Sequence, residues 1–284
     1  MRHEVVIRLG FFFGILAIMT LWELMAPRRV LTASKVIRWI NNIGVVFLNS
    51  FLLRVIFPTA AIGIAIFAQK HGWGLFNYFQ IPHRIIIVLS VIIMDFTIYL
   101  QHVMFHAVPV FWRMHRMHHA DMDFDVTTGI RFHPFEIILS MLIKFAMIVV
   151  LGPPVLAVVT FEVVLNATSM FNHGNVRMLR GVDQVLRWFV VTPDMHRVHH
   201  SIEDYETNSN FGFNLPWWDR LFGTYVPEKD GVPIRYGLVK AMTTNSALAV
   251  CLTEWINIGR DLLKARRLSD ALGYLFGPPG WAPN

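Results

Sequence analysis

Three long apolar runs in the first 106 residues constrain the fold of this chain more than any other feature. They extend from Leu9 to Met25, from Ile43 to Ala68 and from Ile85 to about His106. A helix needs about 20 mostly apolar residues to cross a bilayer, so each run is long enough. Composition agrees, because 55% of the residues are apolar and 15% are charged, against roughly 45–50% and 25% in soluble domains. We therefore expect an integral membrane protein.

The first two apolar runs each have a feature that bears on how they cross the membrane. The first is too long for the core of a signal peptide and has no small-residue cleavage site after it, so we expect a retained transmembrane helix. Arg54 interrupts the second run. A single bent helix and two separate segments are both compatible with that charge.

A fourth apolar region, from Phe135 to Phe171, is broken by Gly152-Pro153-Pro154. Proline cannot continue a helix, so this break predicts a hairpin of two helices, Phe135–Leu151 and Val155–Phe171. Both are near the lower length limit for a full crossing, and shallow insertion is also compatible with them. We expect an all-α integral membrane protein with about four transmembrane helices: two spans, a helical hairpin and a histidine-bearing span.

Basic residues predict the orientation of these spans. Lys and Arg gather on the cytoplasmic side of membrane proteins, and they are frequent after the first and the third run. The residues concerned are Arg28, Arg29, Lys35, Arg38, Arg113, Arg116 and Arg131. Because a hairpin begins and ends on one side, the chain after Phe171 should be cytoplasmic too. The net charge of +6 fits this pattern better than nucleic-acid binding, which would need a basic run with interleaved aromatic residues.

We expect three parts along the chain: N-terminal spans at 1–84, a middle domain at 85–226, which the motifs described below mark as the catalytic domain, and C-terminal cytoplasmic helices at 227–284. The polar segment after Asn172 should form a helical cytoplasmic cap over the membrane part. Within it, Ala247–Arg267 has apolar residues at helical spacing and ends in KARR. Such a helix lies along a membrane surface or packs on the cap, and the sequence leaves both open.

Histidines are the second unusual feature. The pattern His-x-x-His-His occurs twice, in MHRMHH at Met114–His119 and in MHRVHH at Met195–His200. Residues at i, i+3 and i+4 share one face of a helix. Three clusters follow this spacing: His102 and His106; His115, His118 and His119; and His196, His199 and His200. The topology places all three on one membrane face, where eight imidazoles would repel when protonated unless something binds them.

Two polar stripes lead toward these clusters. Asp95, Tyr99, His102 and His106 recur at helical spacing in the third run, and Glu162, Asn166, Ser169 and His173 do so in the hairpin. Polar residues inside a membrane helix are costly and usually serve function. His173 is therefore expected to join the ligands. His133, before the proline of RFHPFE, fits a ligand and a helix-capping residue equally well.

Ligand number indicates two metal ions, because one zinc ion needs about four ligands and eight to ten histidines are available. Ligand type leaves iron, zinc, copper and nickel open. Two adjacent ions are able to hydrolyse a substrate or to activate oxygen. The Glu-x-x-His pairs typical of soluble di-iron bundles are missing.

The three histidine clusters, read as HVMFH, HRMHH and HRVHH, resemble the histidine boxes of the membrane-bound fatty acid hydroxylase/sterol desaturase superfamily. Further stretches resemble its bacterial members: RFHPFE, TPDMHRVHHS, NFGFNLPWWDRLFGTY and the terminal FGPPGW. The resemblance is strong over Asp95–Tyr225 and weaker over the last ten residues.

The resemblance implies a non-haem di-iron centre that uses O2 and two electrons to hydroxylate or desaturate a lipid C–H bond. Its implied metal ligands are His102, His106, His115, His118, His119, His133, His173, His196, His199 and His200. Asp95, Glu136 and Asp194 are candidates for orienting ring N–H groups. The lipid would enter from the bilayer between the spans and react at the cytoplasmic end, which for a bacterial member means the inner membrane.

Two features of the family bear on the cofactors. The chain has no His-Pro-Gly-Gly haem motif and no glycine-rich dinucleotide fingerprint, so electrons should come from a separate donor, a ferredoxin or a cytochrome b5-type protein with its reductase. The last ten residues of the chain also resemble the branch of the superfamily that contains the pteridine-dependent ether-lipid monooxygenase. That branch has a glutamate after the second histidine, where this chain has Ala107.

A metal transporter or metal sensor is the alternative from another class. It would need a polar path across the whole bilayer, whereas both stripes stop partway. Metal uptake into vesicles would separate the two.

Overall fold

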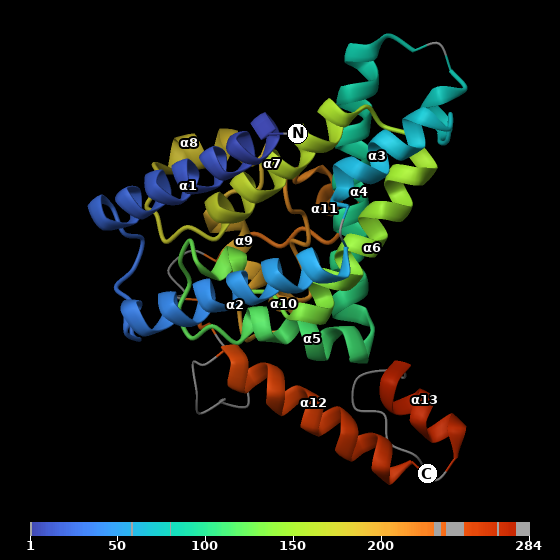
Figure 1. The fold of residues 1–284 in the computed structure, drawn as a ribbon. Helices are drawn as coiled ribbons and strands as arrows, with labels where there is room; N and C mark the ends of the chain where they lie inside the picture. Colours follow the sequence, from blue (N-terminus) through green and yellow to red (C-terminus); the bar gives the residue numbers. More distant parts are fainter. Residues whose placement is uncertain are drawn as a thin grey trace.

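The computed structural model describes residues 2–57, 59–79, 81–229, 234–236, 247–265 and 267–276. Within these ranges the chain forms helices and no β-strand (Figure 1). The α-helices are α1 Arg2–Met25, α2 Lys35–Ile56, α3 Ala61–Lys70, α4 His83–Ala107, α5 Pro109–His119, α6 Pro134–Leu151, α7 Val155–Asn172, α8 Arg180–Leu186, α9 Pro193–His199, α10 Asp204–Thr207, α11 Trp217–Phe222, α12 Ala247–Lys264 and α13 Leu268–Phe276. Two short 3₁₀ helices are η1 Leu75–Asn77 and η2 Thr128–Ile130. The all-α prediction is confirmed. Residues Gly277 to Trp281 of the terminal FGPPGW motif lie outside the described ranges.

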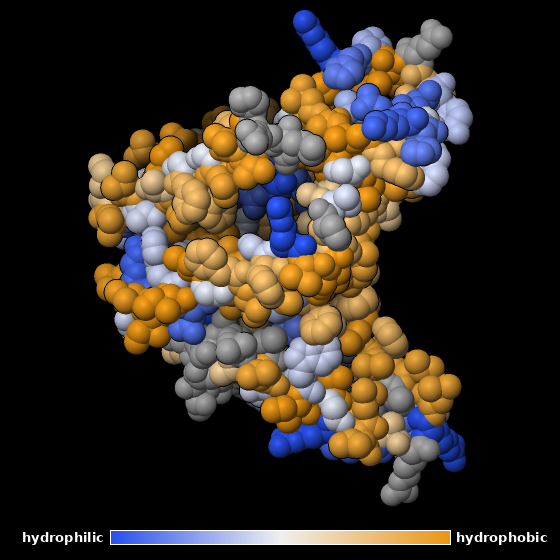
Figure 2. Space-filling model, in the orientation of Figure 1, coloured by the Kyte–Doolittle hydropathy of each residue, from blue (hydrophilic) through white to orange (hydrophobic). Residues whose placement is uncertain are grey.

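Five helical stretches are long and apolar enough to cross a membrane. They are Val5–Met25, Lys35–Asn77, His83–Ala107, Pro134–Leu151 and Val155–Asn172. Their outward faces are largely apolar in Figure 2. The stretch around Arg54 forms two helices, α2 and α3, rather than one bent helix: α2 ends at Ile56, and the Phe57 N–H closes it by donating to the Leu53 carbonyl oxygen (2.9 Å).

The hairpin of α6 and α7 turns at Gly152, as the sequence predicts. Gly152 has a left-handed φ of 64°, and its N–H donates to the Ile148 carbonyl oxygen (2.9 Å). The loop before α4 packs directly on this turn, because a Cβ on Gly74 would lie 2.1 Å from the Gly152 nitrogen. Only glycine allows this close approach together with the left-handed φ of Gly74 (101°).

α7 is the centre of the membrane part. It packs against α1, α3 and α4, and its C-terminal end approaches α9 (Figure 1). The apolar core between α3, α4, α6 and α7 includes Met94, Ile98, Ile148, Val158 and Phe161. α4 in turn packs on α5, which begins two residues after α4 ends. The histidines at the ends of α4, α5, α7 and α9 are thereby brought to one region.

A buried ionic network fixes the loop between α5 and α6. Arg38 of α2 is fully buried and pairs with Asp121 (2.7 Å) and Asp125 (2.6 Å). Glu23 of α1 accepts hydrogen bonds from the backbone N–H groups of Val126 (2.7 Å) and Asn175 (2.9 Å). We expected Arg38 to lie in the basic loop after the first span, but it belongs to α2 and its buried side chain pairs with these two carboxylates.

Candidate metal centre

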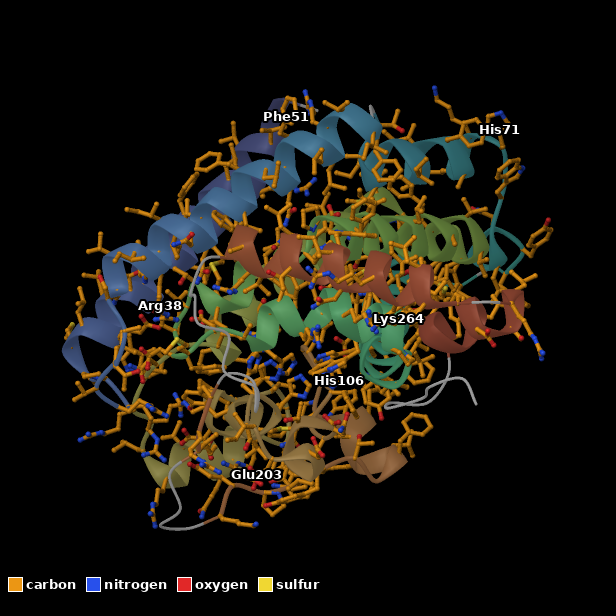
Figure 3. The ribbon with its side chains drawn as sticks, turned by 90° about the horizontal axis from the view of Figure 1, so that it is seen from below. Arg38, Phe51, His71, His106, Glu203 and Lys264 are labelled. Carbon is orange, nitrogen blue, oxygen red and sulfur yellow. The ribbon has the colours of Figure 1, made fainter. Side chains whose placement is uncertain are left out.

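Two groups of buried histidines meet at the inner ends of α4, α5, α7 and α9. The first group is His102, His106, His115, His119 and His199, and the second is His118, His173, His196 and His200. Within each group the ligand atoms lie within 4.8 Å of one another. Nitrogen-rich side chains surround His106 in the interior in Figure 3. The structure therefore brings together nine of the ten histidines singled out from the sequence.

Each His-x-x-His-His stretch contributes to both groups. On α5, His115 and His119 join the first group, whereas His118 joins the second. At α9 the division is reversed: His199 joins the first group, and His196 and His200 join the second. We expected each copy to converge on one point, but neighbouring rings on one helical turn differ in direction and join two separate groups.

Hydrogen bonds at Nδ1 fix which ring nitrogen carries the proton. In the first group His102 donates from Nδ1 to the Phe211 carbonyl oxygen (2.8 Å), and His199 donates to that of Ser209 (2.7 Å). In the second group His118 and His173 donate to the Arg131 (3.2 Å) and Ser169 (2.7 Å) carbonyl oxygens. A carbonyl oxygen only accepts, so Nδ1 is protonated and Nε2 has a free lone pair in these neutral rings.

These Nε2 lone pairs point at one another. His102 Nε2 lies 3.1 Å from His115 Nε2, and His173 Nε2 lies 3.0 Å from His118 Nε2. In the His173–His118 pair each Nδ1 carries the proton that it donates to a carbonyl oxygen, so no proton lies between the two Nε2 atoms. Both ring nitrogens of His119 and Nε2 of His199 are buried with no hydrogen-bond partner among the described residues. Buried lone pairs that face each other unpaired are costly, and a shared cation satisfies them.

Burial also keeps the rings uncharged. It lowers the pKa of His118, His119, His196 and His200 well below the usual range, and it lowers the pKa of His173 and of His199 to about 3. The neighbouring imidazoles act in the same direction, since each disfavours a second positive charge. Neutral imidazole is the form that binds metal ions. The residues present therefore fit two adjacent metal ions with nitrogen ligands.

His133 lies in neither group. Its Nδ1 accepts a hydrogen bond from the Phe135 N–H (3.1 Å) at the start of α6, and the Trp255 indole nitrogen lies 3.1 Å from its Nε2. The ring thus caps α6, which is the structural alternative that the sequence left open. Burial lowers its pKa to about 4, so the ring is neutral at pH 7.

We expect His133→Ala to lower the free energy of unfolding by about 1 kcal/mol, the usual cost of losing a helix N-cap. The metal content of the purified protein should stay unchanged, because the ring belongs to neither group. Thermal unfolding and metal analysis of the same preparation check this. A variant that loses one metal ion per chain would make His133 a ligand after all.

Of the three carboxylates expected to orient rings, Glu136 contacts a histidine. Its Oε1 accepts a hydrogen bond from His115 Nδ1 (2.7 Å). Asp95 instead accepts from the indole of Trp218 (2.8 Å) and from two backbone N–H groups of the loop 214–215. Asp194 pairs with Arg28 (3.1 Å) and Arg197. Spacing alone could not separate these roles, because it gives no information on what faces a carboxylate from another helix.

We expect Glu136→Gln to lower metal affinity about tenfold and Glu136→Ala about a hundredfold, the range for a partner behind a metal-bound histidine. The amide keeps an acceptor for His115 but loses the negative charge that makes the ring a stronger ligand. Competition with a chelator measures the affinity. Glu203→Gln is the matched control, because Glu203 is exposed on the surface and pairs with Arg235. Equal affinities for Glu136→Ala and the control would contradict the assigned contact.

The backbone carbonyl groups of Ser209 and Phe211 were not foreseen from the sequence. Their loop is held by Asp219, which accepts hydrogen bonds from the N–H groups of Phe211 (2.7 Å) and Gly212 (2.8 Å). The signal was present in the motif WDRLFGTY, whose Asp219 is fully buried. Asp219 of that motif therefore holds the loop whose carbonyl oxygens accept hydrogen bonds from His102 and His199.

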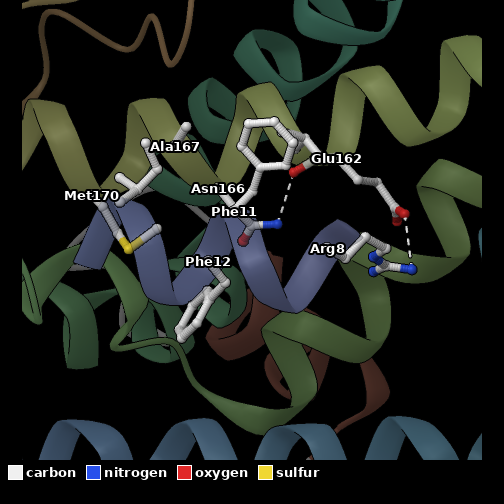
Figure 4. A pocket seen from close by; sticks show the side chains of 9 residues that line it. Arg8, Phe11, Phe12, Glu162, Asn166, Ala167 and Met170 are labelled. Carbon is white, nitrogen blue, oxygen red and sulfur yellow. Dashed lines mark hydrogen bonds and ion pairs between the residues drawn. The ribbon is translucent and has the colours of Figure 1, made fainter. Parts of the chain in front are cut away.

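The outer part of the α7 stripe does not reach the metal centre. Glu162 pairs with Lys144 (3.0 Å) and Arg8 (3.2 Å) inside the membrane part. A narrow pocket of about 10 Å³ lies beside this ion pair, between α1 and α7 (Figure 4). Phe11, Phe12, Ala167 and Met170 line it among others. Ser169 and His173 at the inner end of the stripe are the residues that join the site.

The part of the chain that contains both histidine groups is also similar to known proteins. Residues 87–224 match the family model for fatty acid hydroxylases. The chain is 28% identical over 244 residues to an alkylglycerol monooxygenase of Xenopus tropicalis, covering 85% of this chain and 53% of that protein. It is 32% identical over 146 residues to an ornithine lipid hydroxylase of Rhizobium tropici, covering 51% of this chain and 43% of that protein. The human alkylglycerol monooxygenase is 26% identical over 194 residues, covering 66% of this chain and 41% of that protein.

The chain thus spans about half the length of the curated relatives it matches. No solved structure gives a significant match.

Proposed function

Because this chain belongs to the fatty acid hydroxylase/sterol desaturase superfamily, we propose that it is a membrane-bound di-iron oxidoreductase that hydroxylates or desaturates a lipid C–H bond. The observation that carries the proposal is the pair of buried imidazole groups, five and four histidines in number, with their lone pairs facing inward. The five apolar stretches make the chain a multi-pass membrane protein, so its substrate is available in the bilayer.

Iron is the metal that this proposal assigns to both groups. Imidazole ligands alone also suit zinc and copper, but the relatives are oxygenating enzymes by name, a monooxygenase and a hydroxylase. When bound, an iron pair supplies the reduction of O2 that C–H oxidation requires. For hydroxylation the balance is one C–H bond, one O2, two electrons and two protons giving one C–OH bond and one water. For desaturation two C–H bonds are lost and two waters form.

The residues of this chain have the following roles in the proposal. His102, His106, His115, His119 and His199 hold one iron ion, and His118, His173, His196 and His200 hold the other. Glu136 and the backbone carbonyl groups behind His102, His118, His173 and His199 keep the rings in place. The apolar body of the lipid enters from the bilayer between the candidate spans.

The active site lies on the cytoplasmic face in this proposal, which is the inner face of the inner membrane in a bacterial cell. Electrons come from a separate donor, a ferredoxin or a cytochrome b5-type protein with its reductase. The observation behind the orientation is the set of basic residues after α1 and α4.

An ether-lipid monooxygenase with a pteridine as reductant is the second candidate. The alkylglycerol monooxygenase of Xenopus tropicalis, which covers 85% of this chain, favours it. Ala107, at the position after the second histidine where that branch has a glutamate, counts against the pteridine. Turnover of an alkylglycerol with a tetrahydropteridine, compared with turnover with reduced ferredoxin, separates the two candidates.

Lipid mass spectrometry under 18O2 tests the proposed reaction directly. Cells that express the protein should contain a lipid that cells without it lack. We expect that lipid to be heavier by one 18O atom after hydroxylation, or lighter by two hydrogens after desaturation. Identical lipid profiles in the two kinds of cell, with iron-loaded protein present, would contradict the proposed function.

A further inference from the structure

The C-terminal helix α12 has two different apolar sides. Val250 is buried beside Val45 of α2 and Met117 of α5, so one side packs on the body of the protein. On the opposite side Leu252, Ile256 and Leu263 are 55%, 53% and 88% exposed. Their spacing of four and seven residues places these three on one stripe. α13 adds Leu268, Leu272 and Phe276, which are also exposed and recur every four residues. We call these six residues the C-terminal apolar stripe.

A cationic pocket lies next to this stripe. It has a volume of about 320 Å³ and is lined by Arg113 and Arg116 of α5 and by Asn257, Arg260, Asp261 and Lys264 of α12. Asp261 pairs with Arg113 (2.6 Å) and Lys264 (3.1 Å), and Arg116 also has a partner. Arg260 has no ion pair among the described residues, so its positive charge is available to an anion.

The pocket and the stripe share one edge of α12. Arg260 and Lys264 are one turn apart, and Leu263 of the stripe lies between them in sequence. A helix with an apolar face and a row of basic residues beside it is typical of a helix lying in the surface of an anionic membrane. Figure 2 shows apolar and charged residues next to one another over α12 and α13, and Figure 3 shows the position of Lys264 near the end of α12.

The position of the pocket relative to the spans agrees with a membrane surface. α4 is a candidate span and ends at Ala107, and α5 begins at Pro109. Arg113 and Arg116 are four and seven residues into α5, about 6–10 Å along its axis. Arg113 reaches toward α12, where it pairs with Asp261 (2.6 Å), and none of the six lining residues of the pocket is a histidine. The pocket thus lies outside the metal centre, near the level where the spans leave the bilayer.

We propose that the pocket of Arg113, Arg116, Arg260 and Lys264 binds the phosphate of an anionic phospholipid headgroup, with the C-terminal apolar stripe inserted among the lipid chains beside it. The pair α12–α13 is then a surface anchor of the membrane part. Charge complementarity and the adjacent exposed apolar stripe select a phospholipid over a free anion, which would use the cations but leave the stripe in water. This anchor goes beyond the proposed oxidation reaction and does not depend on it.

Hydrogen–deuterium exchange of the full-length, iron-loaded protein in lipid nanodiscs tests the proposal. We expect the backbone amides of α12 to exchange about tenfold more slowly in discs with one-third phosphatidylglycerol than in pure phosphatidylcholine, since each basic residue near an anionic surface contributes. The variant Arg260→Gln/Lys264→Gln should lose this difference. The matched control Arg177→Gln/Lys229→Gln removes two positive charges elsewhere and should retain it. Ile256→Ser/Leu263→Ser should exchange faster than the wild type in anionic discs.

Four outcomes would overturn the proposal: equal exchange of the wild type in both kinds of disc; a difference that survives in Arg260→Gln/Lys264→Gln; slowing by inorganic phosphate or by an acidic ferredoxin in neutral discs; and slowing only in discs that hold two copies of the chain. The third would assign the pocket to a free anion or to an electron donor, and the last to a second copy. Iron content, measured on the same samples, should be equal in all variants, so a failure here is distinct from a failure of the metal centre.

Discussion

The change His173→Ala should remove one of the two iron ions and abolish lipid oxidation. His173 Nε2 lies 3.0 Å from His118 Nε2 and 3.1 Å from both His196 Nε2 and His200 Nε2, so it is central to the second group. The wild-type protein should contain about two iron ions per chain and the variant about one. Turnover should fall by much more than the roughly 10–100-fold that loss of a supporting contact costs, because a ligand itself is removed. Metal analysis and product formation on the same preparation measure both effects.

His71→Ala is the matched control for this change. His71 is exposed at the end of α3 and takes part in neither group, so its loss should leave two iron ions and full activity. A His173→Ala protein with two iron ions and wild-type turnover would refute the assignment of the second group. A wild-type protein that is fully active without metal would refute both groups.

The change Gly129→Ala should affect the same iron ion without removing any ligand. A Cβ on Gly129 would lie 2.5 Å from the Ser169 carbonyl oxygen and 3.0 Å from His173 Nδ1. Those two atoms form the hydrogen bond that holds the His173 ring (2.7 Å). The neighbourhood has little room to adjust, because Ser169 Oγ also donates to the Gly129 carbonyl oxygen (2.6 Å). We expect a loss of iron affinity of at least about tenfold at the second group, as for other contacts behind a ligand.

Gly44→Ala and Gly181→Ala are suitable controls for this change, since a Cβ at either glycine would meet no atom within 4 Å. Chelator competition followed by metal analysis gives the affinity, and thermal unfolding shows whether the fold is retained. A Gly129→Ala protein that binds iron as tightly as these controls would mean that the ring of His173 does not depend on the Ser169 contact.

The fold was largely predictable because hydropathy and helix breakers act locally. The predicted span Ile85–His106 compares with α4 at His83–Ala107, and the hairpin helices agree with α6 and α7 to within one residue. The family resemblance is confirmed, since it depends on the same local motifs. Hydropathy could not predict the burial of Arg38, because the carboxylates that pair with its side chain are more than eighty residues away in sequence.

The candidate site was predictable as a set of residues but not as an arrangement. Spacing shows that three histidines of one turn share a face, yet it does not show which rings of another helix they meet. The division of each His-x-x-His-His stretch between two groups therefore came from the structure. The same limit applied to Glu162, whose place in a polar stripe suggested the metal centre but whose nearest charges are Lys144 and Arg8.

The interleaving of the two histidine groups has a consequence for biogenesis. The first group includes His199, and the second includes His196 and His200, so neither is complete until α9 has docked on α4, α5 and α7. During synthesis all five candidate spans emerge before α9 does. In the proposed two-ion site, metal binding would therefore follow membrane insertion, and a nascent chain that stalls before residue 196 would lack ligands for both groups.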